Sequence, residues 1–224
     1  MSIKIGNLSE EELMTLMEEM FMKNETSERY RLLHAGKGES GYSFGLVQCD
    51  CRHRQDGRDF IKALLVDENV DGSQVNEIIS TMKDSSGKLS QESIKLVDRV
   101  LEKNKEKVDK FDQEIMKNEM HHIYKIVTTI GGTVAEKLLD PICFLQLLDY
   151  HNQFNCETKG KMVQFLKGQL EIDGKKLDLT CNLIDEIRRF INATRYAKNG
   201  GLKNLQNRQK NINGIKLPNL IKTH

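Results

Sequence analysis

Residues 25–54 hold the side chains of this chain that are best suited to acid–base chemistry. The stretch reads ETSERYRLLHAGKGESGYSFGLVQCDCRHR and lacks the long apolar period of a core helix. Its carboxylic acids are Glu25, Glu28, Glu39 and Asp50. A carboxyl that is partly withdrawn from water keeps its proton to higher pH, as a general acid near neutral pH must. The elements around this stretch therefore have to place at least one carboxyl at the edge of an apolar surface.

The helix that leads into the stretch is predicted to end at its first carboxyl. Ser9-Glu10-Glu11-Glu12 is a capping box, and apolar residues follow it at helical spacing. They are Leu13, Leu16, Met17, Met20 and Phe21. This pattern predicts a helix from about Ser9 to Asn24, with Glu25 half desolvated at the end of the buried stripe. Glu28 is the alternative, because one further turn of helix would bring it to the same face.

The middle of the stretch predicts a small β-ribbon. Glycines at positions 36, 38, 41 and 45 permit tight or left-handed turns. Residues 30–32 and 42–47 alternate as short paired strands do. We expect a twisted ribbon between helices, with carboxylates on its turns, that forms one wall of a cleft.

Residues 38–50, GESGYSFGLVQCD, resemble a segment of goose-type lysozymes. In that segment an acidic residue leads into a glycine-rich turn and then into Phe-Gly-Leu-Met-Gln-Val-Asp. The order of a helix ending in Glu and then a ribbon is also similar to phage-type lysozymes and related peptidoglycan-cleaving toxins. The resemblance implies a mainly α, α+β lysozyme-like fold, with a helical core and a small ribbon. It would be a single domain over residues 1–224, with an N-terminal lobe over 1–66 and a helical lobe over 67–224.

The same resemblance implies a muramidase, a glycoside hydrolase that cleaves the glycan backbone of bacterial peptidoglycan and acts as an endolysin or antibacterial effector. Glu25 or Glu28 would be the general acid. Glu39 and Asp50 stand where goose-type enzymes carry aspartates, so either could be the second carboxylate. The remaining candidates are Ser43, placed like the threonine that phage-type enzymes hold near the attacking water, and Gln48 and Tyr42 as substrate contacts. Inverting hydrolysis, retaining hydrolysis and lytic transglycosylation all stay open.

The bulk composition favours helices and gives no argument for nucleic acid. The chain has 34 Lys and Arg against 33 Asp and Glu, with only two prolines and no tryptophan. This nearly balanced charge gives no global electrostatic argument for a nucleic-acid partner. Residues such as Leu, Met, Ile, Lys and Glu dominate, which is a helical composition.

The cysteine pattern predicts reduced thiols and no metal site. The five cysteines lie at positions 49, 51, 143, 156 and 181, an odd number without repeated spacing. Cys49-x-Cys51 followed by His53 has too short a gap for a zinc site. Residues 67–72 begin like a calcium loop, but Ile78 stands where the loop needs Glu. We expect a polar cap for the next helix there, and neither metal nor cofactor in the protein.

The N-terminus turns acidic at once and has no apolar segment of the signal-peptide kind, and no run is long enough to span a bilayer. We therefore expect synthesis in the cytoplasm, no membrane insertion, and delivery to the cell wall or periplasm by a secretion system or a holin. An antibacterial toxin would also have an immunity or inhibitor protein as a partner, beside the glycan strand itself.

The C-terminal half is predicted to supply the core and part of the substrate site. The most apolar helix begins at Asp140-Pro141 and ends in the segment 149–154, DYHNQF. Several lysozyme-like families similarly follow a buried helix with such a turn, which implies that Tyr150 stacks on a sugar while Asn152 and Gln153 bond its polar groups. An ordinary polar helix exit explains the same residues. The tail from Lys198 is predicted to be loop-like.

Two other classes of function fit parts of the sequence. A non-enzymatic helical effector or adaptor that binds a protein partner through its amphipathic helices explains the composition, but it does not explain the glycine-rich ribbon. A thiol enzyme would pair Cys49 or Cys51 with His34 or His53 as nucleophile and base.

Overall fold

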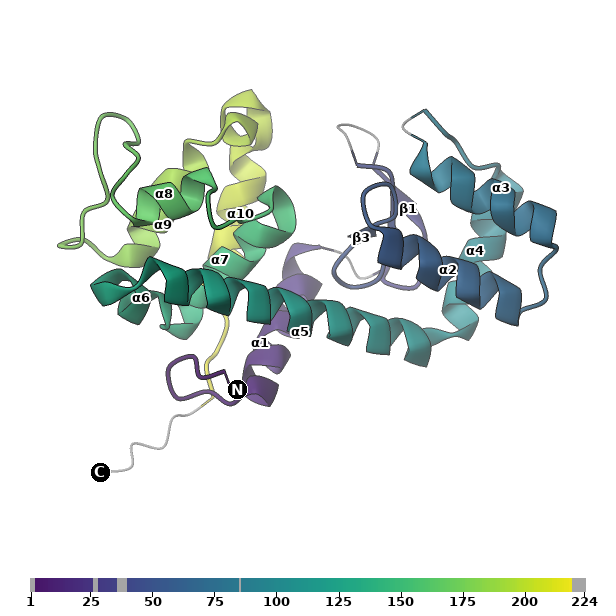
Figure 1. Ribbon diagram of the computed structural model, residues 1–224, viewed down its shortest axis with the longest axis horizontal. Coiled ribbons are helices and arrows are strands. Elements are labelled where there is room, and N and C mark those ends of the chain that lie inside the picture. Colours follow the sequence, from purple (N-terminus) through teal and green to yellow (C-terminus); the bar gives the residue numbers. More distant parts are fainter. Residues whose placement is uncertain (1–2, 26–27, 36–39, 85, 219–224) are drawn as a thin grey trace. The chain divides into compact units, whose positions relative to one another are not determined.

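The computed structural model (Figure 1) describes residues 3–25, 28–35, 40–84 and 86–218. Within them the chain is mainly helical, with one small antiparallel sheet, so the predicted mainly α, α+β class is confirmed. Glu39, one of the predicted carboxyls, lies outside the described residues. Among the helices that the structure describes, none is both long and apolar enough to cross a bilayer.

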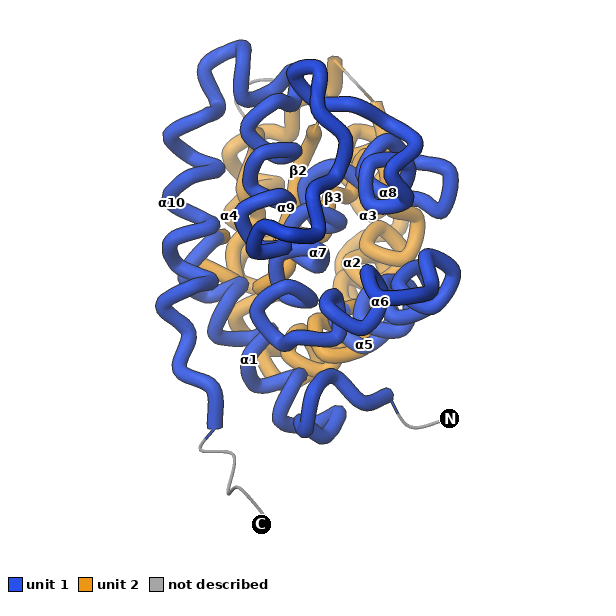
Figure 2. Tube along the Cα trace, turned by 90° about the vertical axis from the view of Figure 1, so that its left-hand side faces the viewer, with its two compact units in different colours: residues 1–24, 116–224 blue, residues 25–115 orange. Residues whose placement is uncertain are grey.

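The chain divides into two compact units (Figure 2). Unit 2 is residues 25–115, and unit 1 combines residues 1–24 with residues 116–224. This division differs from the predicted lobes, 1–66 and 67–224. The helices are grouped by the apolar faces they cover rather than by sequence order: the first helix packs on helices of the C-terminal part, and the three that follow the sheet pack together.

The sheet of unit 2 has the strand order β1 (Leu33–His34), β2 (Tyr42–Phe44) and β3 (Cys49–Asp50). Both pairings are antiparallel, and Ser43 lies opposite Leu33 on one side and Asp50 on the other. Because side chains alternate along a strand, Tyr42, Phe44 and Cys49 are buried while Ser43 and Asp50 are only half-buried. The predicted ribbon is therefore present, with one apolar and one polar side, but its first strand lies at 33–34 rather than within 30–32, and its second ends at Phe44 rather than Val47.

The apolar side of this sheet packs against helices of unit 2, through Phe60 and Phe111. Four helical segments of the described chain belong to this unit. They are α2 (Gln55–Asp67), α3 (Gly72–Lys83), α4 (Gln91–Lys103) and the first part of α5 (Lys105–Ile130). The rings of Phe44, Phe60 and Phe111 stack, with centroids 4.4–5.6 Å apart. Asp71 accepts hydrogen bonds from the amides of Ser73 and Gln74. The predicted polar cap at the calcium-like segment is thus confirmed.

Unit 1 begins with α1 (Glu10–Asn24), which confirms the predicted first helix. The capping box forms as expected: the Ser9 amide donates to Glu12 Oε2 at 2.7 Å, and the Glu12 amide donates to Ser9 Oγ at 3.2 Å. The predicted apolar stripe is the buried face of the helix. It consists of Leu13, Leu16, Met17, Met20 and Phe21.

The other helices of unit 1 surround α7 (Pro141–Phe154), the central core helix that its apolar sequence predicts. Asp140 caps it through the amides of Ile142 and Cys143. The remaining helical elements are the second part of α5, α6 (Gly132–Leu138), α8 (Lys161–Leu166), α9 (Leu183–Asn192), the π-helical segment η1 (Ala197–Gly201) and α10 (Leu202–Asn213).

The prediction of a loop-like tail is wrong as far as Asn213. In α10, residues 205, 208, 209 and 212 form a buried stripe at spacings of three, four and seven. Two of the four are Arg208 and Gln209, so the stripe is not visible as an apolar pattern. The helix is held by polar contacts in the interior of unit 1, which sequence periodicity does not report.

Candidate functional site

The half-buried side of the unit 2 sheet brings three predicted site residues together. Ser43 and Asp50 are direct cross-strand neighbours, and such neighbours lie on the same face. The Ser43 hydroxyl donates to Gln48 Oε1 at 2.9 Å. We name Ser43, Gln48 and Asp50 the polar ribbon face. Each of the three side chains keeps part of its surface exposed.

The turn between β2 and β3 fixes Gln48. The Gln48 backbone has φ = 52°, a left-handed conformation that costs a non-glycine residue about 1–2 kcal/mol. The Gln48 Nε2 group donates to the Gly45 carbonyl at 2.8 Å, which holds the side chain over its own turn. Gln48 is thus oriented at both ends of its amide, by Gly45 and by Ser43.

Asp112 on α5 holds this turn from inside and is absent from the sequence prediction. Its fully buried carboxylate accepts a hydrogen bond from the Leu46 amide at 2.8 Å. Burial raises the pKa of Asp112 to about 6, against the opposing effects of the Leu46 amide and the Arg29 guanidinium. Gly45 has φ = 79°, and a Cβ there would collide with the Asp112 carboxylate, so glycine is required at this position.

The segment that follows the candidate acids is tied to the same turn. The Gly45 amide donates to the Arg29 carbonyl at 2.9 Å. Arg29 Nη2 lies 2.8 Å from Asp109 Oδ1 and 3.6 Å from Asp112 Oδ2. The Tyr30 hydroxyl donates to Asp109 Oδ1 at 3.0 Å. These contacts anchor the chain just after Glu28 beside the turn that carries Gln48.

The two candidate acids differ in exposure. Glu25 is half-buried and directly follows α1. The Glu28 side chain is 52% exposed, and its Oε1 lies 3.6 Å from Arg31 Nη1 in a surface ion pair. Of the two, Glu25 is the less exposed, as predicted for a carboxyl at the end of the apolar stripe of α1.

Asp50 is held in one orientation by three groups. Its Oδ1 accepts from the Arg52 amide at 2.9 Å and from the Gly41 amide at 3.2 Å. Its Oδ2 lies 2.9 Å from His53 Nδ1. These bonds stabilise the turn after β3, and they also present a fixed carboxylate beside Ser43. Such a group can orient a water molecule or balance positive charge that develops on a substrate.

Tyr42 is a core residue, so its predicted contact with substrate is wrong. It is 4% exposed, and its hydroxyl oxygen accepts from the Leu89 amide at 2.8 Å. Its ring packs edge-on against His34, with centroids 4.5 Å apart. The alternation of the strand places Tyr42 on the side opposite Ser43, and a ring in that position has no surface to offer a sugar.

The thiols of this ribbon are buried and not suited to nucleophilic chemistry. All five cysteines are free, and Cys49 and Cys51 are buried. Burial raises the pKa of Cys49 to about 12 and raises the pKa of Cys51 as well, whereas a nucleophilic cysteine needs a lowered value. Among the described residues, His, Cys, Asp and Glu side chains form no group of three or more that could hold a metal ion.

The residues predicted to contact substrate from α7 lie in unit 1 and are largely occupied there. The Tyr150 ring packs against Phe154 and Phe190, at centroid distances of 5.2 and 5.8 Å. Burial raises the pKa of Tyr150 to about 12. With its amide oxygen toward Arg208, Gln153 accepts from both Nη atoms at 2.8 Å. Asn152 is half-buried. Tyr150 and Gln153 are half-buried, and both side chains make contacts within unit 1.

A buried ion pair in unit 1 fixes the end of α1. Arg208 Nη2 lies 2.6 Å from Asp149 Oδ1, and both residues are buried. Arg208 Nη1 donates to the Asn24 carbonyl at 2.9 Å, and Asn24 Nδ2 donates to Asp149 Oδ1 at 3.0 Å. Asn211 Nδ2 adds a bond to the Lys23 carbonyl at 3.1 Å. We name these residues the α1-end network.

The α1-end network was not predicted from the sequence, although it satisfies the last carbonyls of the helix that Glu25 follows. Comparison with known proteins adds no assignment, since no family model, curated protein or solved structure matches the chain. The functional argument therefore depends on the geometry of the polar ribbon face and on the exposure of the two candidate acids.

Proposed function

We propose that this chain is a lysozyme-like glycosidase that cleaves the glycan backbone of bacterial peptidoglycan. The observation that carries the proposal is the polar ribbon face. Ser43, Gln48 and Asp50 share one side of a small sheet, and the Gly45–Arg29 hydrogen bond ties their turn to the segment that follows Glu25. This layout supports the resemblance of residues 38–50 to lysozyme segments, because three of those residues lie on one side of the sheet.

Glu25 is the general acid in this proposal. Cleavage of a glycosidic bond needs a proton on the leaving oxygen, and Glu25 is the less exposed of the two candidate carboxyls that could donate it. Attack on the sugar carbon needs a second group that activates or positions a water molecule. Asp50 is the described carboxylate with the fixed orientation for this role, and Ser43 and Gln48 lie beside it to bind the water or a sugar hydroxyl.

The stereochemical outcome depends on the separation of the two carboxyls. A gap of roughly 6.5–9.5 Å leaves room for a water and gives inversion, whereas about 5–5.5 Å gives retention through a covalent intermediate. Glu39 remains the other candidate for the second carboxylate. If neither carboxylate acts, a hydroxyl of the sugar itself attacks the reacting carbon and the enzyme is a lytic transglycosylase.

The direct test is the clearing of a purified peptidoglycan suspension by Glu25→Gln. This variant keeps the shape of the side chain and removes its proton-donating group, so we expect a loss of at least about 100-fold in rate. Glu28→Gln is the matched control, because Glu28 is in an exposed ion pair, and we expect it to retain activity within about twofold. Circular dichroism checks that both variants are folded.

The outcome separates the proposal from its alternatives. Loss of lysis in Glu28→Gln alone would move the acid role to Glu28. Full lysis by both single variants, or no lysis by the wild-type chain, would overturn the glycosidase proposal and favour a non-enzymatic effector or adaptor. Mass spectrometry of the products then identifies the reaction, since a reducing N-acetylmuramic acid end indicates a muramidase and an anhydro end indicates a transglycosylase.

The proposal carries two expectations about biological context. An enzyme that acts on peptidoglycan has to reach the cell wall, through a secretion system or a holin if it has no signal peptide of its own. An antibacterial effector of this kind also needs an immunity or inhibitor protein in the cell that makes it.

A further inference from the structure

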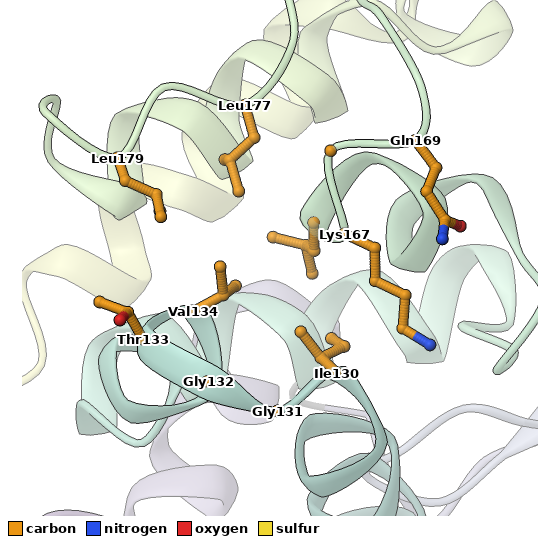
Figure 3. A pocket seen from close by; sticks show the side chains of 11 residues that line it. Ile130, Gly131, Gly132, Thr133, Val134, Lys167, Gln169, Leu177 and Leu179 are labelled. Atoms are coloured by element: carbon orange, nitrogen blue, oxygen red, sulfur yellow. The ribbon is translucent and has the colours of Figure 1, made fainter.

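A pocket in unit 1 has no role in the proposed reaction. Its volume is about 520 Å³, within the range of small-molecule sites in proteins. It is lined by the end of α5 and the start of α6, by the residues that follow α8, and by the loop before α9. Figure 3 shows Val134, Leu177 and Leu179 pointing toward one another across the hollow.

This pocket has an aliphatic part beside a polar one, and its charged lining is positive. Ile130, Val134, Leu177 and Leu179 supply the apolar surface, and Lys167 is the charged residue among the described residues that line it. A second cation stands at its edge, where Lys137 Nζ donates to the Leu179 carbonyl at 2.8 Å. The carboxylate of the neighbouring Asp178 is engaged elsewhere, by Thr180 and Cys181.

Glycines keep the pocket open. Gly131, Gly132 and Gly168 line it with φ values of 70°, 60° and 67°, and at each of them a Cβ would meet no atom within 4 Å apart from those of its own local backbone and chain neighbours. Positive φ explains why glycine is favoured at each turn. At these three positions the hollow is bordered by backbone rather than by a side chain.

The loop that forms one wall is held in place. Residues 167–182 form a long connection between α8 and α9 without a helix of its own, and such connections are often functional. The Arg189 guanidinium donates to the carbonyls of Ile172 and Lys176 at 2.8 and 2.9 Å. Glu186, which Arg189 also binds, accepts from the Asp178 amide at 2.9 Å. The wall is thus preformed, which lowers the entropic cost of binding a ligand.

We propose that this pocket binds an aliphatic carboxylate, with the hydrocarbon chain on the leucine, isoleucine and valine walls and the carboxylate at Lys167. The aliphatic lining provides binding energy in proportion to the apolar area that the ligand buries. Lys167 is positively charged, and the described lining contains no acidic residue. The pocket therefore favours a ligand with an anionic head group. The proposal is independent of the glycosidase proposal, since it uses no residue of the polar ribbon face and its test reads binding rather than lysis.

The test is an NMR titration of the full ¹⁵N-labelled chain with hexanoate, octanoate and decanoate, and with 1-octanol as the neutral counterpart. We expect saturable shifts in the amides of residues 130–134, 166–169 and 177–179. Affinity should rise about three- to fourfold for each added methylene until the pocket is filled. Octanoate should bind more tightly than 1-octanol by about two- to fivefold, as expected for an exposed ion pair.

Two pairs of variants localise the effect. Lys167→Gln should remove the preference for octanoate over 1-octanol, whereas Lys161→Gln, an exposed lysine of α8 outside the pocket lining, should leave it unchanged. Leu179→Asn should weaken both ligands several-fold, whereas Leu202→Asn should not; the two leucines are matched at 37% and 38% exposure. The same spectra show whether each variant is folded.

Several results would overturn the proposal. They are shifts that do not saturate or that lie outside the pocket, equal affinity for octanoate and 1-octanol in the wild-type chain, or equal effects of Leu179→Asn and Leu202→Asn. Saturable binding that depends on chain length and is weakened selectively by Lys167→Gln and Leu179→Asn would support it.

Discussion

The polar ribbon face of unit 2 and the α1-end network of unit 1 use the same kinds of residue for opposite purposes. Each contains an aspartate in a hydrogen-bonded cluster. Asp50 keeps part of its surface exposed, whereas Asp149 is buried against Arg208. Burial, rather than residue type, decides whether a polar group is available to a ligand or committed to the fold.

This contrast changes the assignment of the predicted site residues. DYHNQF at the end of α7 and YSFGLVQCD in the ribbon look equally suited to bind a sugar when only residue types are considered. In the structure the first segment is largely occupied by aromatic packing and by Arg208, and the second presents Ser43, Gln48 and Asp50 on one face. The predictions below test whether this division of roles is correct.

The largest effect is expected from Arg208→Met. Removing the cation leaves the buried Asp149 carboxylate without its charged partner, and the Asn24 carbonyl loses a hydrogen bond. We expect a loss of about 3–5 kcal/mol in the free energy of unfolding, measured by urea denaturation. Arg188→Met is the control, because Arg188 makes an exposed ion pair with Asp185 and should cost less than about 1 kcal/mol.

A second variant sharpens the result. Since the cost arises from an uncompensated buried charge, replacing Asp149 by Leu in the Arg208→Met background should recover much of the lost stability. Equal, small effects of Arg208→Met and Arg188→Met would contradict the view that the α1-end network is a structural ion pair.

A smaller effect, and one that depends on pH, is expected from Asp112→Asn. The pKa of Asp112 is raised from its ordinary 3.8 to about 6 by burial, so the folded state binds its proton more tightly than the unfolded state. The stability that this group contributes is therefore fully present below about pH 4 and is lost as the pH rises through about 6. The change is on the order of 3 kcal/mol for a shift of this size.

Urea denaturation of the wild type and Asp112→Asn from pH 4 to pH 7 measures this contribution. The difference in unfolding free energy between the two chains should change in favour of the variant by up to ~3 kcal/mol over that range. Some carboxyls, such as Asp56 and Glu186, have lowered pKa values, and their contributions to stability change with pH in the opposite direction. These contributions are the same in both chains, so they cancel when the two chains are compared at each pH. A difference that does not vary with pH would show that Asp112 is ionised throughout.

Much of the fold could be predicted because it depends on local signals. The capping box at Ser9, the apolar stripe of α1, the Asp140-Pro141 start of α7 and the alternating residues of the ribbon are each encoded within a few neighbouring residues. Local signals also gave the Asp71 cap, because Asp before a helical stripe satisfies free amides whatever the tertiary context.

The rest depends on residues far apart in sequence. The buried stripe of α10 contains Arg208, whose partner Asp149 lies 59 positions away, so its periodicity has no apolar signature. The same holds for Asp112, which lies in a charged segment of α5. Its hydrogen-bond partner Leu46 is 66 residues away in the sequence. Tyr42 shows a third kind of limit: the strand pattern was visible, but its two faces could be told apart only once the packing helices were known.

The smallest effect on stability is expected at the polar ribbon face, from Asp50→Asn. Asparagine can still accept the Arg52 amide through one oxygen, so we expect a loss of only about 1 kcal/mol in unfolding free energy. Asp84→Asn is a matched control in the same unit, because Asp84 also accepts the amide two residues on, from Ser86 at 2.9 Å, and lies outside the ribbon. Urea denaturation should show about the same loss of unfolding free energy for the two variants.

The two variants should separate in peptidoglycan lysis, which is where the proposed function enters. If Asp50 places the water for sugar hydrolysis, Asp50→Asn loses about 100-fold in rate while Asp84→Asn stays near wild type. If both variants keep full activity, Asp50 is a turn-forming aspartate like Asp84, and the second carboxylate has to be sought at Glu39. If Asp50→Asn instead unfolds the ribbon at a cost near that of Arg208→Met, the half-exposed face is as structural as the buried network, and the contrast between the two units does not hold.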